Sequence, residues 1–348
     1  MRKRIKIGNR WVGDGEPTFV VAEVGQNHNG DVGIAKKLID LSAAAGVDAV
    51  KFCKRNLKYE LTEEAYDAPY ENPNSFGPTY GKHREALEFS PAQHKEVQAH
   101  CRRRKVIYFS SVCDPLSADQ MEALKVPVYK IASRDLTNLP LLDHVARKKT
   151  PIILSTGMST LAEIDGAVNA IARHHDRLIL LQCVSQYPAD PENLNIRAML
   201  TMRERYDCLT GYSCHNVGVL APTIAAVMGA CVVEKHVTLS RAMKGTDQAG
   251  SLEPDGLYRV VRYIRYIPVM MGQGKKDILP VEVPSRRKLA RSVVPIRDIG
   301  KGEKITIKML GLKSPGTGLA ASHVFDLVGK RAARDLQEDE LVGLQDFA

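Results

Sequence analysis

The sequence lacks the cysteine pairs of a disulfide scaffold or a cysteine-bound structural zinc site. Its seven cysteines are odd in number and no two stand in a C-x-x-C pair, so most are expected to be small buried residues in a reducing compartment. The chain has no apolar run near the ~18 residues that a membrane span needs. Its basic start, residues 1–7, leads into no apolar signal core. We therefore expect a soluble, cytoplasmic protein.

Aromatic residues are scarce as well, at 6% of the chain, while Lys and Arg exceed Asp and Glu by 49 to 40, a formal charge of +9. Such a charge suits nucleic acid or small anionic substrates in a basic cleft. The denser basic clusters, residues 102–105 and 286–288, have the character of solvated helix ends or linkers. Aromatic residues are too few for base-stacking platforms. The expected partners are phosphorylated or carboxylated metabolites, and not nucleic acid.

Between residues 18 and 271, short apolar runs alternate with longer stretches of helical period. This alternation predicts parallel strands joined by helices. No G-x-G-x-x-G motif follows the first run, which argues against a dinucleotide-binding sheet. Eight runs over this length favour an α/β fold of the (β/α)8 TIM-barrel type over an open doubly wound sheet. The expected strands lie at residues 19–24, 49–52, 106–109, 128–131, 152–155, 178–181, 208–212 and 231–236.

The pattern predicts a catalytic barrel at residues 1–271, a linker at 272–289 and a small, mostly β module at 290–348. A module of this size is marginal for independent stability, so we expect it to dock on a barrel. Residues 57–90, which contain several prolines, asparagines and glycines, predict a long loop at the barrel mouth. Loops of that length usually serve function.

Polar side chains end nearly every expected strand. In a parallel barrel the carboxyl ends of the strands meet at one rim, where catalytic groups lie. Hydroxyl residues there can simply cap the next helix, but two lysines, a glutamate, two histidines and several serines on one rim indicate catalysis. These residues are Glu23, Lys51, Ser110, Ser111, Lys130, Ser133, Ser155, Ser185, Ser213, His215 and His236.

Lys51 and Lys130 lie inside apolar strand runs, where an unpaired ammonium group is costly. Ion pairs with Glu23 or Asp135, together with packing of the lysine stems, would explain them structurally. Alternatively, the two cations clamp an anionic ligand, with serine hydroxyls completing the site. One lysine could instead form a Schiff base, because burial lowers a lysine pKa. The residues alone leave these alternatives open.

His215 and His236 end consecutive expected strands, so their rings could come within bridging distance of one metal ion. A single histidine at a strand end is more often a hydrogen-bonded core residue, and the spacing is not that of an H-E-x-x-H motif, so both readings stay open. Glu234 precedes His236 by two residues and therefore points to the same face of the strand. Asp247 stands in the following loop.

Together these residues resemble the sialic acid (N-acetylneuraminate) synthase family. The likeness runs in order over almost the whole chain, and the last module resembles the family's antifreeze-like (SAF) domain. Residues 10–13, 79–83 and 292–294 are similar to the animal-type synthases in particular. The matching stretches are 22–31 (AEVGQNHNGD), 130–133 (KIAS), 154–159 (LSTGMS), 187–188 (YP), 211–215 (GYSCH), 234–239 (EKHVTL), 245–247 (GTD), 300–303 (GKGE) and 327–330 (LVGK).

The resemblance implies condensation of phosphoenolpyruvate (PEP) with the aldehyde of N-acetylmannosamine or its 6-phosphate, with release of phosphate. It implies a divalent cation, Mn2+ or Mg2+, on His215 and His236, and a domain-swapped homodimer in which the small module of one chain overhangs the other's barrel. PEP would be held by Lys51, Ser111, Lys130, Ser133, Ser155, Ser185 and Ser213. The residues facing the sugar or the water would be Glu23, Asp135, Tyr187 and Asp247.

Several positions depart from the family's pattern and leave the sugar open. Cys53 stands where relatives carry Gln, Arg134 where Gly is usual, and Gln248 where many have His. Ser314 precedes Pro315 in a stretch that lacks the Arg of bacterial members. The alternatives are a legionaminate or pseudaminate synthase, a Schiff-base pyruvate aldolase, and a non-catalytic carbohydrate- or ice-binding protein. Retention of the strand-end residues argues against the last, because a binding module needs none of them.

Overall fold

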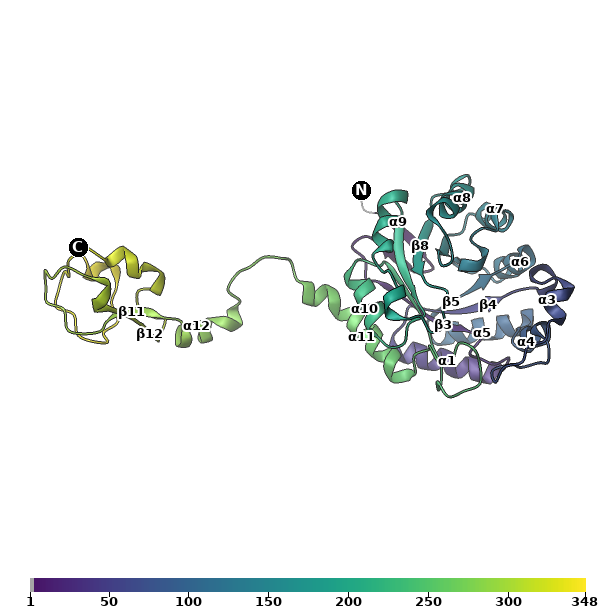
Figure 1. The fold of residues 1–348 in the computed structure, drawn as a ribbon, viewed down its shortest axis with the longest axis horizontal. Coiled ribbons are helices and arrows are strands. Elements are labelled where there is room, and N and C mark those ends of the chain that lie inside the picture. Colours follow the sequence, from purple (N-terminus) through teal and green to yellow (C-terminus); the bar gives the residue numbers. More distant parts are fainter. Residues whose placement is uncertain (1–2) are drawn as a thin grey trace. The chain divides into compact units, whose positions relative to one another are not determined.

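The computed structural model describes residues 3–348. The chain divides into two compact units, Met1–Gly272 and Gln273–Ala348, and Figure 1 shows the elements of both. Each unit has its own cluster of buried apolar side chains. Two cores are expected, because a single hydrophobic core stops growing at this chain length.

The first unit, drawn in Figure 1, is a closed barrel of parallel strands. Its last strand pairs with its first. The predicted TIM barrel is confirmed, and every expected strand forms, with its ends shifted by at most a few residues. The strands are β3 (Phe19–Gly25), β4 (Ala49–Lys54), β5 (Ile107–Val112), β6 (Tyr129–Ile131), β7 (Ile152–Ser155), β8 (Leu178–Cys183), β9 (Leu209–Cys214) and β10 (Val232–His236).

A helix follows each barrel strand and packs outside the barrel. Side-chain caps begin several of these helices: Asp31 accepts from the backbone of Ile34 at 3.0 Å, and capping boxes start at Ser90 and Thr160. Within residues 3–348, no helix has the length and apolar character that crossing a bilayer requires. The helices are α1 (Val32–Ala45), α5 (Pro91–Arg103), α6 (Pro115–Ala123), α7 (Leu139–Arg147), α8 (Leu161–Ala172), α9 (Ala198–Tyr206), α10 (Leu220–Val227) and α11 (Pro254–Met271), with 3-10 turns at Ser133–Asp135 and Pro191–Asn193.

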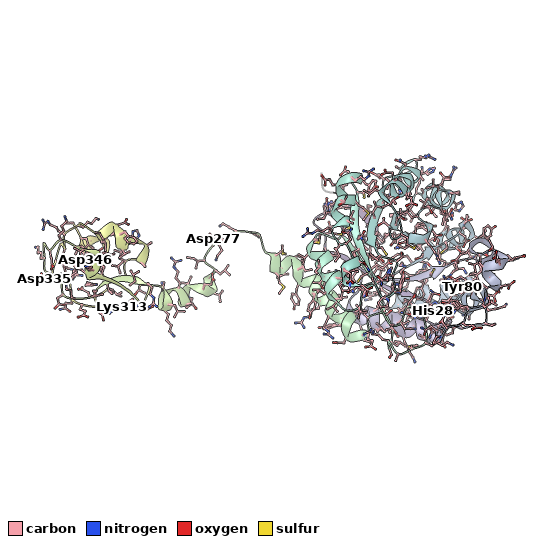
Figure 2. All side chains as sticks on the ribbon, viewed as in Figure 1. His28, Tyr80, Asp277, Lys313, Asp335 and Asp346 are labelled. Atoms are coloured by element: carbon pink, nitrogen blue, oxygen red, sulfur yellow. The ribbon has the colours of Figure 1, made fainter. Side chains whose placement is uncertain are left out.

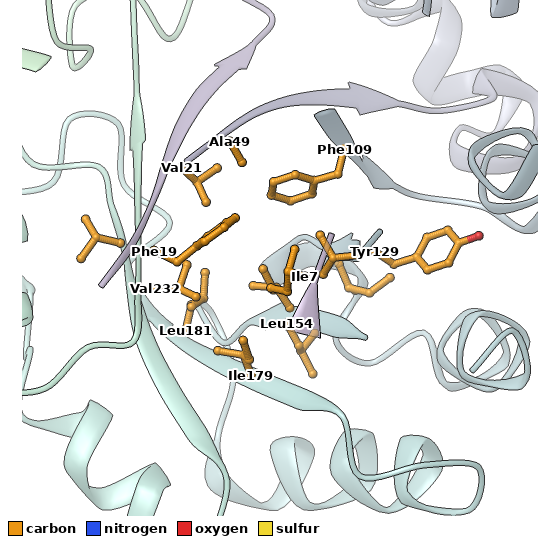
Figure 3. Close-up of a cluster of buried hydrophobic side chains, with 14 of the residues drawn as sticks. Ile7, Phe19, Val21, Ala49, Phe109, Tyr129, Leu154, Ile179, Leu181 and Val232 are labelled. Atoms are coloured by element: carbon orange, nitrogen blue, oxygen red, sulfur yellow. The ribbon is translucent and has the colours of Figure 1, made fainter. Parts of the chain in front are cut away.

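A short hairpin, β1 (Arg4–Ile7) and β2 (Arg10–Gly13), precedes the barrel and was not expected from the sequence. Burial alternates along β1 and covers the second half of β2, which places Ile5, Ile7 and Val12 in the barrel core. Figure 3 shows Ile7 among side chains of the barrel strands, such as those of Phe19 and Phe109. The hairpin therefore adds apolar surface to the barrel core.

Residues 57–90 are not the irregular loop that their prolines and glycines predicted. They contain three short helices, α2 (Leu57–Glu60), α3 (Glu63–Asp67) and α4 (Tyr80–Ala86). Asn56, Thr62 and Thr79 each accept a hydrogen bond from the first turn of one helix, which favours helix initiation in such short segments. The segment still lies at the mouth of the barrel, since its residues line the cavity described below.

The second unit is small and mostly irregular, with one antiparallel strand pair. Its core contains Val293, Ile299, Ile305 and Leu327, all nearly inaccessible to solvent. The expected linker, residues 272–289, is partly helical, since its last seven residues form a helix. The elements are a 3-10 turn (Pro280–Glu282), α12 (Val283–Leu289), β11 (Ser292–Pro295), β12 (Leu310–Lys313) and further 3-10 turns at Ile307–Met309, Ala321–Leu327 and Leu344–Asp346.

A buried carboxylate ties the start of the barrel to its last helix. Asp48 lies just before β4, and its Oδ2 accepts hydrogen bonds from the Val20 backbone at 2.8 Å and from Arg265 of α11 at 2.6 Å. The Asp48 side chain is 7% exposed. Its removal would leave a buried backbone N–H and a partly buried guanidinium without their acceptor.

We expect Asp48→Ala to lower the free energy of unfolding of the barrel by about 2 kcal/mol. Urea unfolding followed by the fluorescence of Trp11 measures this, because this residue is the chain's one tryptophan and lies in β2. The control is Glu96→Ala, which breaks an exposed pair with Lys36 and should change stability by less than about 1 kcal/mol. Equal effects of both substitutions would contradict the role given to Asp48.

Candidate active site

A cavity of about 690 Å³ lies at the carboxyl ends of the barrel strands. Its size is in the range of small-molecule sites, and enzymes of this fold bind their substrates at this end. All the predicted site residues except Ser110 and Asp135 line it. They are Glu23, Lys51, Ser111, Lys130, Ser133, Ser155, Ser185, Tyr187, Ser213, His215, His236 and Asp247.

Lys51 of β4 lies in the floor of the cavity between two carboxylates. Its Nζ is 2.8 Å from Glu23 of β3 and 3.5 Å from Glu234 of β10, and it donates to Ser111 Oγ of β5 at 2.9 Å. The three charged side chains are at most 6% exposed. The expected ion pair with Glu23 is therefore present, and Glu234 is a second partner.

Lys130 of β6 is the second buried cation of the floor. Its Nζ donates to Ser155 Oγ of β7 at 2.6 Å and lies 3.9 Å from Glu234. Ser213 of β9 donates to the same Glu234 carboxylate at 3.2 Å. Glu234 thus faces both lysines, and the alternation of side chains along β10 places it on the cavity side together with His236.

Burial and the neighbouring charges shift the pKa values of the lysines and glutamates in this floor. Burial raises the pKa of Glu23 to about 8, with Lys51 opposing the shift and Glu234 adding to it. Burial would raise the pKa of Glu234 too, but the two lysines lower it below its usual value. Burial lowers the pKa of Lys130, whereas the carboxylates around Lys51 outweigh burial and raise its pKa. Glu23 is the group whose charge changes near neutral pH.

His215 and His236 lie side by side, with ring centroids 5.5 Å apart at an angle of 62°. A Cβ at Gly211 would stand 2.3 Å from the Val232 carbonyl oxygen, so this glycine permits the close approach of β9 to β10. Tyr187 stacks on His215 with centroids 4.0 Å apart. The two rings expected at neighbouring strand ends are thus brought together.

The ring nitrogens of these histidines suit a metal ion. His215 Nδ1 is 2.6 Å from the Val184 carbonyl oxygen, a contact that orients the ring and leaves Nε2 to bind. His236 Nδ1 is buried without a hydrogen-bond partner, and Asp247 Oδ2 lies 3.8 Å from it. Among residues 3–348, no group of three or more His, Cys, Asp or Glu side chains is arranged to hold a metal. Further ligands would have to be water or substrate.

Ser133, Ser185 and Gly157 form a small polar wall beside the lysines. The Gly157 backbone donates to Ser133 Oγ at 3.0 Å. A Cβ at Gly157 would stand 2.6 Å from Ser185 Oγ and 2.8 Å from Ser133 Oγ, so only glycine allows both hydroxyls to approach here. Hydroxyl groups next to ammonium groups are a suitable environment for a phosphate or carboxylate.

Asp135 does not join the other predicted residues in the cavity lining. It ends the 3-10 turn Ser133–Asp135. Since three residues complete a turn of such a helix, Ser133 and Asp135 point in different directions. Asp135 Oδ2 is 3.6 Å from Arg134 Nε, and burial raises the pKa of this carboxyl to about 6.

The departures from the family's pattern have structural partners. Arg134 donates to Cys113 Sγ at 3.0 Å and pairs with Glu60 at 2.7 Å. A hydrogen bond with Cys113, together with nearby arginines, lowers the pKa of Cys53, which lines the cavity, well below its usual value. Gln248 is buried and hydrogen-bonded to Thr238 at 2.5 Å.

In the second unit, Ser314 donates to the Leu289 carbonyl at 3.2 Å and accepts from Arg291 at 3.1 Å. Both partners belong to that unit. The hydroxyl of Ser314 therefore links the end of α12 to the turn that follows β12.

The sequence did not indicate which residues form the outer wall of the cavity. The prolines and asparagines of residues 57–90 indicated where this segment would lie, but gave no signal of which side chains face the cavity. Asn74 Oδ1 accepts from the Gly245 backbone at 3.1 Å, which joins the segment to the loop that carries Asp247. The outer lining includes Gln26, Arg55, Tyr70, Asn72, Asn74, Tyr80, His83, Arg84 and Thr246.

Comparison with known proteins identifies the family. The NeuB family matches residues 38–276, and a SAF domain matches residues 290–348. The chain is 35% identical over 335 residues to N-acetylneuraminate-9-phosphate synthase of Mus musculus, covering 96% of this chain and 93% of the mouse protein. It is 36% identical over 324 residues to N,N'-diacetyllegionaminic acid synthase of Legionella pneumophila, covering 91% of each.

Among solved structures, the N-acetylneuraminic acid (sialic acid) synthetase of Leptospira borgpetersenii serovar Hardjo-bovis, in complex with citrate, superposes with a TM-score of 0.72. The identity is 30%, over 82% of this chain and 95% of the other. These relatives are synthases, so the chain is an enzyme and the non-catalytic alternative is wrong. The protein belongs to the NeuB family and ends in a SAF domain.

Proposed function

We propose that the enzyme is an N-acetylneuraminate synthase, which condenses PEP with N-acetylmannosamine or its 6-phosphate and releases phosphate. The observation that carries this proposal is the pair of buried lysines, bonded to Ser111 and Ser155, beside two adjacent imidazole rings. PEP carries a carboxylate and a phosphate, and two ammonium groups with surrounding hydroxyls match such a ligand. The family membership and the named relatives support the same reaction class.

The proposal assigns PEP to the floor of the cavity. Lys51 and Lys130 would neutralise its two anionic groups, and the hydroxyls of Ser111, Ser155 and Ser213 would orient them. Ser133 and Ser185, next to Gly157, would contribute two further hydroxyl groups to this anion-binding site. A fixed orientation matters, because C3 of PEP is a weak nucleophile and must be held against the aldehyde carbon.

The residues proposed to hold a divalent cation are His215 and His236. When bound there, the cation would polarise the aldehyde of the sugar as a Lewis acid. Between the two expected ions, Mn2+ suits the site better, because Mg2+ prefers oxygen ligands while imidazole is an ordinary ligand of transition ions. Asp247, close to His236, and Tyr187, at the mouth, would contact the sugar.

Glu23 is the residue proposed to act at C2 of PEP. Bond formation between C3 and the aldehyde carbon leaves positive charge at C2, which a nearby carboxylate stabilises. Water then adds at C2 and must lose a proton, and a pKa of about 8 suits Glu23 to accept it. Cleavage of the C2–O bond of the tetrahedral intermediate releases phosphate and leaves the ketone of the product.

The second candidate is a legionaminate or pseudaminate synthase, which would use the same floor with another N-acylated hexosamine. It is favoured by the 36% identity to the legionaminic acid synthase of Legionella pneumophila. A Schiff-base aldolase is disfavoured, because Lys51 and Lys130 are each held by hydrogen bonds and facing carboxylates.

We also propose that the protein acts as a domain-swapped homodimer in the cytoplasm.

The function is tested by phosphate release from PEP with a panel of free and phosphorylated N-acylhexosamines. We expect the fastest release with N-acetylmannosamine or its 6-phosphate, with one phosphate per sugar consumed. A faster reaction with a diacetylated hexosamine would favour the second candidate. Pyruvate and borohydride should leave the lysines unmodified, and a trapped lysine adduct would support the aldolase instead.

We expect His236→Ala to lower turnover by about 100-fold or more while the barrel stays folded, because one of the two proposed metal ligands is lost. Phosphate release is measured in chelator-treated enzyme with added Mn2+, alongside calorimetric titration of Mn2+. The control is His174→Ala, which alters a histidine paired with Asp143 outside the cavity. Full activity of His236→Ala in metal-free buffer would refute the proposed site.

We expect Lys130→Met to raise the KM for PEP by about 10- to 100-fold, because a buried charge-assisted contact to the anion is lost. The KM for the sugar should change much less. Steady-state kinetics with each substrate varied separately measures both constants, and Lys37→Met, on the exposed side of α1, serves as the control. An unchanged KM for PEP would remove Lys130 from the anion site.

A further inference from the structure

One cation of the outer cavity wall has no acidic partner. Arg84 of α4 lines the cavity and is half-buried. Its guanidinium donates to the Tyr80 hydroxyl through Nε at 2.9 Å and Nη2 at 2.6 Å, and to Gln26 Oε1 through Nη1 at 3.1 Å. All three acceptor contacts are to neutral groups, and no ion pair of Arg84 is found among residues 3–348.

The other arginines of the lining differ from Arg84 in this respect. Arg134 pairs with Glu60 at 2.7 Å, and Arg55 pairs with the half-buried Glu88. The carboxylate balances part of the charge of each of these two guanidinium groups. Arg84 therefore contributes the uncompensated positive charge of the outer wall.

The geometry of Arg84 also suits a ligand. A guanidinium has five N–H donors, and the contacts to Tyr80 and Gln26 use three of them, which leaves one on each terminal nitrogen. The charge centre lies 5.0 Å from the centroid of the Tyr80 ring, a cation–π contact that limits movement of the side chain. Figure 2 marks Tyr80 on the first unit. Two adjacent free donors in a fixed orientation match two oxygens of a phosphate.

We infer that Arg84 is the specificity-determining residue for a phosphate group on the sugar, so that the preferred acceptor is a 6-phosphorylated N-acylhexosamine. This inference rests on the proposed function. The aldehyde carbon of the open-chain sugar must face PEP on the floor, so C6, at the other end of the chain, points to the outer wall. The outer wall is where Arg84 lies, since its partner Gln26 follows the end of β3.

The test compares kcat/KM for N-acetylmannosamine 6-phosphate and for free N-acetylmannosamine in the wild-type enzyme and in Arg84→Gln. We expect the wild type to prefer the phosphorylated sugar, and Arg84→Gln to lower kcat/KM for that sugar by about 10- to 100-fold. The value for the free sugar and the KM for PEP should change by a much smaller factor. Arg84→Lys keeps the positive charge but not the paired N–H donors of the guanidinium, so it should retain part of the preference for the phosphorylated sugar.

Lys82→Gln is the matched control, because it removes a charge from the same helix at a side chain that faces Glu85 and does not line the cavity. It should leave the preference unchanged. A loss of activity in Arg84→Gln that is equal for both sugars would mean that Arg84 only supports Tyr80 and Gln26, and would overturn the inference. So would a wild type that prefers the free sugar. If the wild type turns over no hexosamine with PEP, the proposed function itself fails.

Discussion

Four buried charges at the carboxyl end of the barrel depend on one another. Lys51 and Lys130 face Glu234, and Lys51 also faces Glu23, with every one of these side chains at most 6% exposed. Loss of one member leaves an opposite charge in a medium of low dielectric, which costs about 3–5 kcal/mol. Apolar residues of similar volume would serve stability as well, so the network is better explained by the ligand that it binds than by the fold.

This network also sets the charge that an anion meets in the cavity. Two lysines and two carboxylates nearly cancel, and burial raises the pKa of Glu23 to about 8, so the net charge of the floor changes with the protonation of Glu23. A bound anion raises the pKa of a neighbouring carboxyl further. Anion binding and protonation of Glu23 should therefore favour each other, whereas the reaction proposed above needs the ionised form of Glu23 to stabilise charge at C2 and to accept the proton of the attacking water.

The barrel and its floor could be predicted from sequence, because both follow from local periodicity. Alternating side chains place Lys51 or Glu234 on a known face, and closure of the sheet brings strand ends together wherever they occur in the chain. The hairpin of β1 and β2 could not be predicted, because a four-residue strand such as Arg4–Ile7 is too short to show a clear alternation of polar and apolar residues. Asp135, whose role was implied only by the family resemblance, lies outside the cavity lining, because Ser133–Asp135 form a 3-10 turn in which its side chain points away from that of Ser133.

The outer wall is harder to predict for a physical reason that also bears on its function. Many of its side chains come from the seven-residue helix α4 and from the irregular stretch before it, whose position depends on contacts such as that of Asn74 with Gly245. Since the strand ends are fixed by the barrel, they can hold the part of the reaction common to related synthases. Changes in residues 57–90 leave the barrel hydrogen bonds intact, so the choice of sugar can vary there while the floor is kept.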